Sequence, residues 1–246
     1  MIAPTGHSSG LEACTAVILV GGFGTRLRSI VFDRPKPMAE VHGRPFVTFL
    51  LDQLVAVGMT DVVLCTGYRG DQVVGNLGAR YKSVTLRYSH EVQTLGTAGA
   101  LRQALPFLNS ETVLAFNGDS FCNADLNAFF AWHVRKTAVL SLVLAWTDNV
   151  ARFGQVSVDE TARVTQFTEK NASVGPGLIN AGIYLLSRKV IDQLPANQTL
   201  SLEKEIFPSF IQSGLYGYPT NGSFIDIGTP DSYAAADAFF KTLGLE

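Results

Sequence analysis

The sequence predicts an α/β fold with a mostly parallel sheet, contained in one domain. Runs rich in β-branched residues alternate with helical patterns along the chain, which is typical of successive strand, helix and strand units. Several of the strand-like runs are apolar at nearly every position, as parallel strands buried on both faces should be. The chain has 246 residues, 47% of them hydrophobic. This is enough for one large α/β domain or two small ones, and we expect one.

Five strand-like runs lie in the first part of the chain. They cover residues 15–20, 61–66, 84–88, 112–117 and 138–146. Two helical patterns between them fit crossover helices. The pattern at 45–58 has a proline near its start and a glycine at its end, and the pattern at 125–137 begins on Asp125 as N-cap and finishes in basic residues.

The second part of the chain has shorter strands separated by glycine and proline turns. We expect strands within 153–159, 162–170 and 179–187, then a helix at 201–214. A final helix should open with Thr229 as N-cap and Pro230 as its first residue. The predicted organisation is a flexible leader at 1–14 and a single domain at 15–246. A first half covers about 15–146, and a second half, about 147–246, packs on the same sheet.

Composition excludes several classes of function. The formal net charge is −2, so the chain has no basic field to hold a nucleic acid. The longest apolar run, 138–146, is too short to span a bilayer, and the N-terminus lacks a positive n-region, so we expect a cytoplasmic protein with no membrane partner. The three cysteines and four histidines lack metal-ligand spacing, and we expect the cysteines to be packing residues: Cys14, Cys65 and Cys122.

A glycine-rich and positively charged loop follows the first predicted strand. Its distinctive residues, in order, are Gly21, Gly22, Gly24, Arg26 and Lys36. A loop in this position lies at the carboxyl ends of the parallel strands, where α/β sheets bind ligands, and bare backbone amides with nearby cations suit phosphate. A dinucleotide-binding fingerprint would need glycine where Leu27 stands, and the Gly-Lys-Ser/Thr ending of a P-loop is absent. A tight turn would explain one or two of these glycines but not the whole pattern.

The stretch LVGGFGTRLRSIVFDRPKPM, residues 19–38, resembles the signature of the sugar-nucleotide pyrophosphorylases, or nucleotidyltransferases: a Gly-X-Gly-X-Arg-Leu loop followed by Pro-Lys. The resemblance continues through EVQTLGTAGAL, FNGDSF, FTEK, INAGIYLLS and GSFIDIGTPDSY. LGTAGAL together with SLEKEIFP looks most like the guanylyltransferases that act on mannose 1-phosphate and D-glycero-D-manno-heptose 1-phosphate, and the length looks closer to the short heptose type. The family fold is a Rossmann-like α/β/α sandwich with a mixed, mostly parallel sheet, in which the first half, about 15–146, would bind the nucleotide and the second, about 147–246, the sugar.

This resemblance implies that GTP and a sugar 1-phosphate condense to a GDP-sugar and pyrophosphate, as a precursor of surface polysaccharide. Catalysis then requires alignment of two repelling phosphates and neutralisation of charge, for which we expect Arg26 and Lys36. Asp119, after a buried strand, and Asp226, between apolar neighbours, are the expected ligands of the cofactor Mg²⁺. Asp119 could instead serve only in a turn. The expected nucleotide-binding residues are Leu19, Gly21, Gly22, Gly24, Thr25, Glu91, Gly96, Thr97 and Gly118.

Base and sugar recognition are assigned to two further regions. Glu91 could accept hydrogen bonds from guanine N1–H and N2–H₂, with Gly96 and Gly99 letting the backbone lie against the purine; the alternative for Glu91 is a solvated charge at a strand end. The family pattern places the sugar against Gly154, Glu169, Lys170, Asn180 and Gly182. Without the family context, Glu169 and Lys170 would read as an exposed charge pair on a turn.

Several alternatives stay open from the sequence. The chain could use another pair of NTP and hexose 1-phosphate, or be a non-catalytic, regulatory paralogue that binds nucleotide sugars. A nucleotide-sugar-dependent glycosyltransferase is disfavoured because the matching stretch, NGDSF, is not an Asp-X-Asp motif. The choice between mannose and heptose is not fixed by the sequence, and neither is the oligomeric state, for which a homo-oligomer is compatible.

Overall fold

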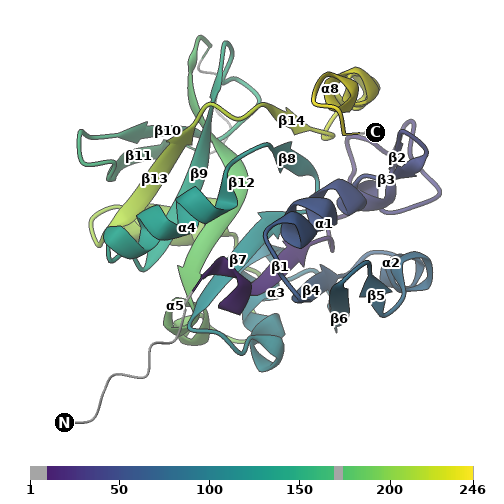
Figure 1. Cartoon of the computed structure of the whole chain (residues 1–246), viewed down its shortest axis with the longest axis horizontal. Helices are drawn as coiled ribbons and strands as arrows, with labels where there is room; N and C mark the ends of the chain where they lie inside the picture. Colours follow the sequence, from purple (N-terminus) through teal and green to yellow (C-terminus); the bar gives the residue numbers. More distant parts are fainter. Residues whose placement is uncertain (1–9, 169–173, 246) are drawn as a thin grey trace.

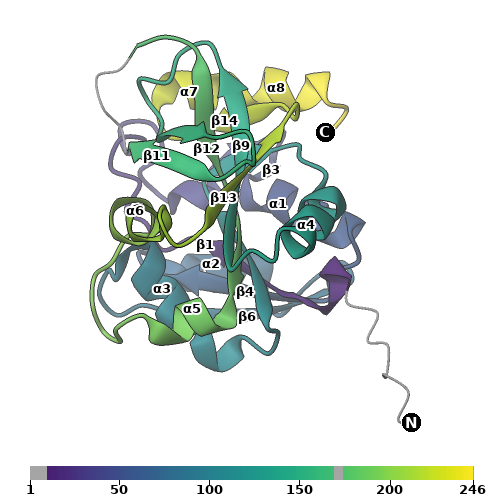
Figure 2. The ribbon, with the colours of Figure 1, turned by 90° about the vertical axis from the view of Figure 1, so that its left-hand side faces the viewer.

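The computed structural model describes residues 10–168 and 174–245 and has a ten-stranded mixed sheet with helices on both faces (Figures 1 and 2). This confirms the predicted α/β/α architecture. The strands are β1 Thr15–Leu19, β2 Glu40–Val41, β3 Arg44–Pro45, β4 Asp61–Thr66, β5 Arg80–Tyr81, β6 Val84–His90, β7 Thr112–Asn117, β8 Ser120–Cys122, β9 Leu140–Thr147, β10 Gln155–Val158, β11 Val164–Thr168, β12 Gly177–Ser187, β13 Leu215–Thr220 and β14 Phe224–Asp226. The helices are α1 Val47–Ala56, α2 Gly70–Leu77, α3 Gly96–Ala104, α4 Leu126–Arg135, α5 Arg188–Gln193, α6 Phe207–Phe210, α7 Pro230–Ala234 and α8 Ala236–Thr242, with short turns η1 Leu11–Ala13, η2 Lys36–Met38, η3 Leu105–Phe107 and η4 Leu202–Ile206.

Four parallel strands form the centre of the sheet, in the order β7-β1-β4-β6. Ile18 of β1 lies opposite Leu64 of β4 on one side and Phe116 of β7 on the other. β1, β4 and β7 are buried along nearly their whole length, which explains why their sequences are mostly apolar, whereas β6 has exposed residues at Thr85 and His90. Their carboxyl ends meet at one edge of the sheet, where the loop after β1 also lies.

Each face of the sheet has its own hydrophobic core, because successive residues of a strand point to opposite faces. Ala16 and Ile18 of β1 pack in the core formed with α1, α2, α4 and α8, whereas Val17 packs in the core formed with α3, α5 and α6. In Figure 2 the second set of helices lies on one side of the sheet, with α1 and α4 on the other. Two helical layers thus hold the central strands in place.

The strands of the second part of the chain extend the same sheet. β12 is antiparallel to β7, β9 and β10, β10 pairs with β11, and β13 runs parallel to β9. The expectation that this region packs on the same sheet therefore agrees with the structure. The division into a nucleotide half and a sugar half stays a prediction.

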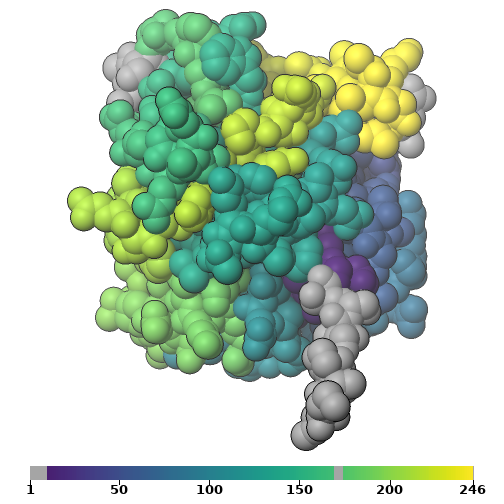
Figure 3. All heavy atoms as spheres, turned by 60° about the vertical axis from the view of Figure 1, so that its left-hand side comes forward, coloured from purple at the N-terminus to yellow at the C-terminus, as the bar shows by residue number. Residues whose placement is uncertain are grey.

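The C-terminal helices differ from the predicted ones. The pattern at 201–214 is broken into η4, which is one turn of π-helix, and the short α6. The last helix divides into α7 and α8, although it opens as predicted, with Thr229 as N-cap in a capping box and Pro230 first. α8 packs on α1, where the rings of Phe49 and Phe240 stack with centroids 3.8 Å apart. Figure 3 shows the C-terminal end of the chain in yellow, above blue residues from the first quarter of the chain.

The remaining composition-based expectations can be compared with the described residues. The cysteines Cys14, Cys65 and Cys122 are all free and buried, as predicted. In residues 10–168 and 174–245, no helix combines the length and the apolar character that crossing a bilayer requires. The same ranges contain no group of three or more His, Cys, Asp or Glu side chains arranged to hold a metal ion.

Candidate functional site

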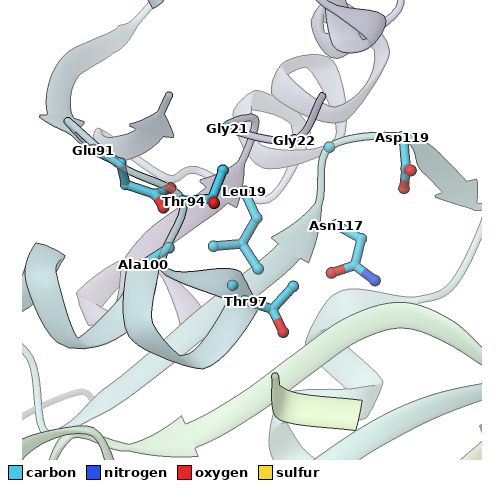
Figure 4. Close-up of a pocket in the computed structure, with 11 residues that line it drawn as sticks. Leu19, Gly21, Gly22, Glu91, Thr94, Thr97, Ala100, Asn117 and Asp119 are labelled. Atoms are coloured by element: carbon cyan, nitrogen blue, oxygen red, sulfur yellow. The ribbon is translucent and has the colours of Figure 1, made fainter. Parts of the chain in front are cut away.

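Two neighbouring pockets lie at the carboxyl ends of β1 and β7. The first is drawn in Figure 4 and is lined by Leu19, Gly21, Gly22, Glu91, Thr94, Gly96, Thr97, Ala100, Asn117, Gly118 and Asp119. Figure 4 shows Glu91 at one end of this pocket and Asp119 at the other, with Leu19 and Thr97 between them. We call it the nucleotide pocket.

The second pocket adjoins the first and is more polar. It is lined by Arg26, Asn117, Asp119, Ser120, Arg152, Phe153, Gly154, Asn180, Glu203, Phe224 and Asp226. Asn117 and Asp119 belong to both pockets. We call the second one the sugar pocket. The shared residues mark a junction where two bound molecules would meet.

Asp119 and Lys36 form an ion pair at this junction. Lys36 Nζ lies 2.6 Å from Asp119 Oδ2, and the lysine side chain is only 9% exposed. Lys36 begins the 3₁₀ turn η2. It lies between Pro35 and Pro37, which restrict the backbone there. The lysine charge is therefore held in a fixed position beside both pockets.

A small separate sheet brings Asp226 to Asp119. β14 is antiparallel to β8, so Asp226 lies opposite Ser120, and the amide of Ile227 donates to the Asp119 carbonyl at 2.9 Å. The prediction that Asp226 lies in a strand is confirmed. Had the two aspartates been on opposite sides of the molecule, a shared metal site would have been impossible.

The Asp226 carboxylate is surrounded by hydrogen-bond donors and cations. Its oxygens accept from Arg152 at 3.0 and 3.3 Å, and Oδ2 accepts from the amide of Gly228 at 2.9 Å. A Cβ placed on Gly228 would lie 3.4 Å from both the Arg26 guanidinium and Lys36 Nζ, so these two cations face the same point. The junction thus holds two carboxylates and three basic side chains within a small volume.

Glu91 is buried, with 8% of its surface exposed, which contradicts the alternative of a solvated charge at a strand end. Its Oε2 accepts from the amide of Leu95 at 2.8 Å. Burial raises the pKa of Glu91, while the Leu95 amide and the nearby His90 act to lower it. A Cβ at Gly21 would lie 2.6 Å from Oε1, so only glycine fits beside this carboxylate without a shift.

A hydrogen-bond network centred on the buried Tyr184 joins residues that line the two pockets. The Tyr184 hydroxyl accepts from the amides of Asn117 and Asn180, both at 2.9 Å, and donates to Glu203 Oε1 at 3.2 Å. Glu203 Oε2 accepts from the hydroxyls of Thr97 and Ser201, both at 2.8 Å. Burial, reinforced by the Glu203 charge, holds the pKa of Tyr184 well above its usual value, so the phenol keeps its proton.

The structure places most of the predicted residues around the pockets. Of the predicted nucleotide-binding residues, those lining the nucleotide pocket are Leu19, Gly21, Gly22, Glu91, Gly96, Thr97 and Gly118. The residues Arg26, Gly154, Asn180 and Asp226 line the sugar pocket. Arg26 therefore shares a pocket with Asp226 and does not line the nucleotide pocket with Gly21 and Gly22. Gly24, Thr25, Lys36 and Gly182 line neither pocket, although Lys36 contacts Asp119, which lines both. Glu169 and Lys170 lie outside the described residues.

Gly99 has a packing role in the structure. A Cβ there would lie 2.5 Å from the carbonyl oxygen of Gln198, so the close approach is to the chain itself. Gly99 does not line the nucleotide pocket, and the expectation that it lets the backbone lie against a purine stays a prediction.

The residues that sequence reasoning missed include four with polar contacts in this site: Asn117, Arg152, Tyr184 and Glu203. Glu203 lies in the quoted motif SLEKEIFP and Asn117 in FNGDSF, so the motifs pointed to them without assigning a role. Tyr184 is in INAGIYLLS, where it reads as a core strand residue. For Arg152 no pattern in the sequence indicated its contact with Asp226.

Comparison with known proteins identifies a family for this chain. The family model described as "Nucleotidyl transferase" matches residues 15–242. The chain belongs to the nucleotidyl transferase family. The solved structure of HddC from Yersinia pseudotuberculosis, complexed with GMP-PN, is similar to this chain, with a TM-score of 0.83 and 31% identity, and the match covers 92% of this chain and 99% of that one.

Two curated members of the family are similar over most of this chain. A D-glycero-alpha-D-manno-heptose 1-phosphate guanylyltransferase from Aneurinibacillus thermoaerophilus is 36% identical over 222 residues, covering 90% of this chain and 96% of that enzyme. A mannose-1-phosphate guanylyltransferase from Mycobacterium tuberculosis is 36% identical over 227 residues, covering 91% of this chain but 63% of that enzyme. The chain thus spans less than two thirds of the length of the mannose relative.

Proposed function

We propose that this nucleotidyltransferase condenses GTP with a sugar 1-phosphate of the manno-heptose or mannose type, giving a GDP-sugar and pyrophosphate. The observation that carries the proposal is the pair of adjoining pockets that share Asn117 and Asp119, with Lys36 fixed at their junction. The guanylyltransferase relatives support the choice of GTP, and the heptose 1-phosphate relative matches this chain along nearly its full length. A GDP-sugar of this type would serve as a precursor of surface polysaccharide.

The proposed reaction is an in-line displacement. An oxygen of the sugar 1-phosphate forms a bond to the α-phosphorus of GTP, while the bond from that phosphorus to the bridging oxygen breaks and pyrophosphate leaves. The attacking oxygen is already anionic, so no general base is required. Lys36 and Arg26 would neutralise charge on the phosphates at the junction and keep the two anions aligned.

A divalent ion fits the residues at this junction. Mg²⁺ is commonly held by one or two carboxylates together with substrate phosphates, and Asp119 and Asp226 supply hard oxygen donors that both line the sugar pocket. When bound, such an ion would reduce the repulsion between the two phosphates. Lys36 and Arg152 contact the oxygens of these carboxylates, and we expect the more exposed Arg152 to turn toward substrate phosphate when the ion binds, while the Lys36 charge stays beside Asp119.

Nucleotide selection is assigned to Glu91. One carboxylate oxygen is held by the Leu95 amide while the residue lines the nucleotide pocket, so the other can accept from the N1–H and N2–H₂ edge of guanine. Adenine offers no such pair of donors. The glycines at 21 and 22 leave room for the nucleotide beside this wall of the pocket.

A pyrophosphate-release assay over a grid of nucleoside triphosphates and sugar 1-phosphates tests the proposal. We expect release with GTP that depends on manno-heptose 1-phosphate or mannose 1-phosphate. Release with a different pair would correct the substrates but keep the reaction. No release with any pair would favour a non-catalytic binding paralogue, and sugar transfer from a finished nucleotide sugar would favour a glycosyltransferase.

A further inference from the structure

The side chain of Asn117 has a buried acceptor without a protein partner. Its Oδ1 makes no hydrogen bond within the described residues, although Nδ2 of the same amide donates to Tyr184. A buried unsatisfied oxygen costs free energy, and such groups persist in native proteins where a ligand satisfies them. Asn117 lines both pockets, so its side chain lies in the wall against which a ligand would bind.

The single proton of the Tyr184 hydroxyl determines which end of the Asn117 amide faces it. A phenol has one proton, and Tyr184 gives it to Glu203, whose carboxylate can only accept. The hydroxyl must therefore accept from the other two neighbours, Asn117 and Asn180, and both must present NH₂ to it. Turning the Asn117 amide over would place two oxygen acceptors against each other.

The side-chain oxygens of Asn117 and Asn180 differ in whether the protein supplies a hydrogen-bond donor to them. Oδ1 of Asn180 accepts from the amide of Gly182 at 3.0 Å, so it is satisfied within the protein. Oδ1 of Asn117 is drawn in Figure 4 on the side of Thr97, toward the nucleotide pocket. The Thr97 hydroxyl cannot satisfy it, because it donates to Glu203 Oε2 and accepts from the Leu202 amide at 2.7 Å.

We propose that Asn117 Oδ1 accepts a hydrogen bond from a ribose hydroxyl of the bound nucleotide, and that Glu203, acting through Tyr184, is the positioning residue that aims it there. With the base at Glu91 and the phosphates at Asp119, the ribose falls between the two ends of the pocket, beside Asn117 and Thr97. This inference rests on the proposed function, since it requires a nucleotide in this pocket.

The π-turn η4 supports the assignment to Glu203. Single π-turns are rare and are found frequently at functional sites. Ser201 caps this turn, accepting from the Glu203 and Lys204 amides, and its hydroxyl also donates to the Glu203 carboxylate. The backbone and the cap therefore hold Glu203 beside the Tyr184 hydroxyl. This gives Glu203, within the motif SLEKEIFP, a role that the proposed reaction alone does not require.

Calorimetric binding of GTP, 2′-deoxy-GTP and 3′-deoxy-GTP, without sugar phosphate, tests the inference on the unaltered protein. We expect one of the deoxy nucleotides to bind about five- to tenfold more weakly than GTP, which is the effect of one lost hydrogen bond to a buried acceptor. Equal binding of all three overturns the inference and leaves the proposed function standing. Failure of GTP itself to bind overturns the proposed function, and the inference with it.

Single-residue variants test which side chains make GTP bind more tightly than a deoxy nucleotide. Asn117→Leu should bind all three nucleotides alike, and Asn117→Ala gives the same test if the leucine variant does not fold. Glu203→Gln should reduce the ratio between GTP and the weaker deoxy nucleotide, because an NH₂ group directed at Tyr184 competes with the Asn117 amide. Asn180→Leu is the matched control: it removes the other donor to Tyr184 and should keep the ratio. Full discrimination in both Asn117 variants would refute the assignment.

Discussion

Replacing Lys36 with methionine should lower kcat/KM for pyrophosphate release by about 100- to 1000-fold without unfolding the protein. Lys36 Nζ is held 2.6 Å from Asp119 Oδ2, and the side chain is 9% exposed, so its charge is in place before substrates bind. Removing one such preorganised electrostatic contact costs about 3–4 kcal/mol of transition-state stabilisation, and each 1.36 kcal/mol is tenfold in rate. Methionine keeps the length and packing of the stem while removing the charge.

The experiment has a matched control elsewhere on the molecule. Lys82 also pairs with an aspartate, Asp52, at 2.5 Å, but its side chain is 56% exposed and lines neither pocket. Exposed pairs contribute at most about 1 kcal/mol to stability, so Lys82→Met should retain wild-type kcat/KM within about twofold. Both variants are measured in the coupled pyrophosphate assay, with circular dichroism to verify folding. A loss below tenfold in folded Lys36→Met would refute the role assigned to this lysine.

Three further predictions concern a glycine of β12, a buried histidine of α4 and the base-recognition end of the site. Gly182 has φ +77 and a Cβ there would lie 2.4 Å from Ser120 Oγ, so Gly182→Ala should reduce the free energy of unfolding by about 1–3 kcal/mol in urea titrations; an unchanged midpoint would contradict this. Burial lowers the pKa of His133 to about 4, so the unfolded chain takes up this proton first as the solution is acidified, and stability should fall by about 3 kcal/mol between about pH 6.5 and pH 4. His133→Gln should flatten that part of the pH profile, and a profile as steep as that of the wild type would show that other groups control it. Glu91→Gln should lower the preference for GTP over ATP about tenfold in kcat/KM; an unchanged ratio would remove Glu91 from base recognition.

The central sheet could be predicted closely because its signals are local. Residues 61–66 and 112–117 are strands with the predicted bounds, since apolar runs buried on both faces are bordered by turn residues. α4 begins after Asp125 as predicted, because the Asp125 side chain accepts from the Ala128 amide at 2.9 Å. In each case the residues that determine the structure are neighbours in the chain.

The parts of the site that escaped prediction depend on contacts between distant segments. Nothing near Glu203 in the sequence indicates that its carboxylate meets Tyr184 and Thr97, and only the tertiary fold brings them together. The burial of Glu91 depends in the same way on how the loop after β6 packs. The family motifs therefore pointed to the right segments, while the direction of each hydrogen bond required the structure.

The β14 and β8 pairing has a consequence for the synthesis of the protein. Asp226 reaches Asp119 only after β14 has been translated and has left the ribosome, whereas β1, β4, β6 and β7 emerge much earlier. The nascent chain can therefore assemble its parallel strands and glycine loop while the junction still lacks one carboxylate. With the proposed role of Asp226, the junction is complete only once β14 has paired with β8.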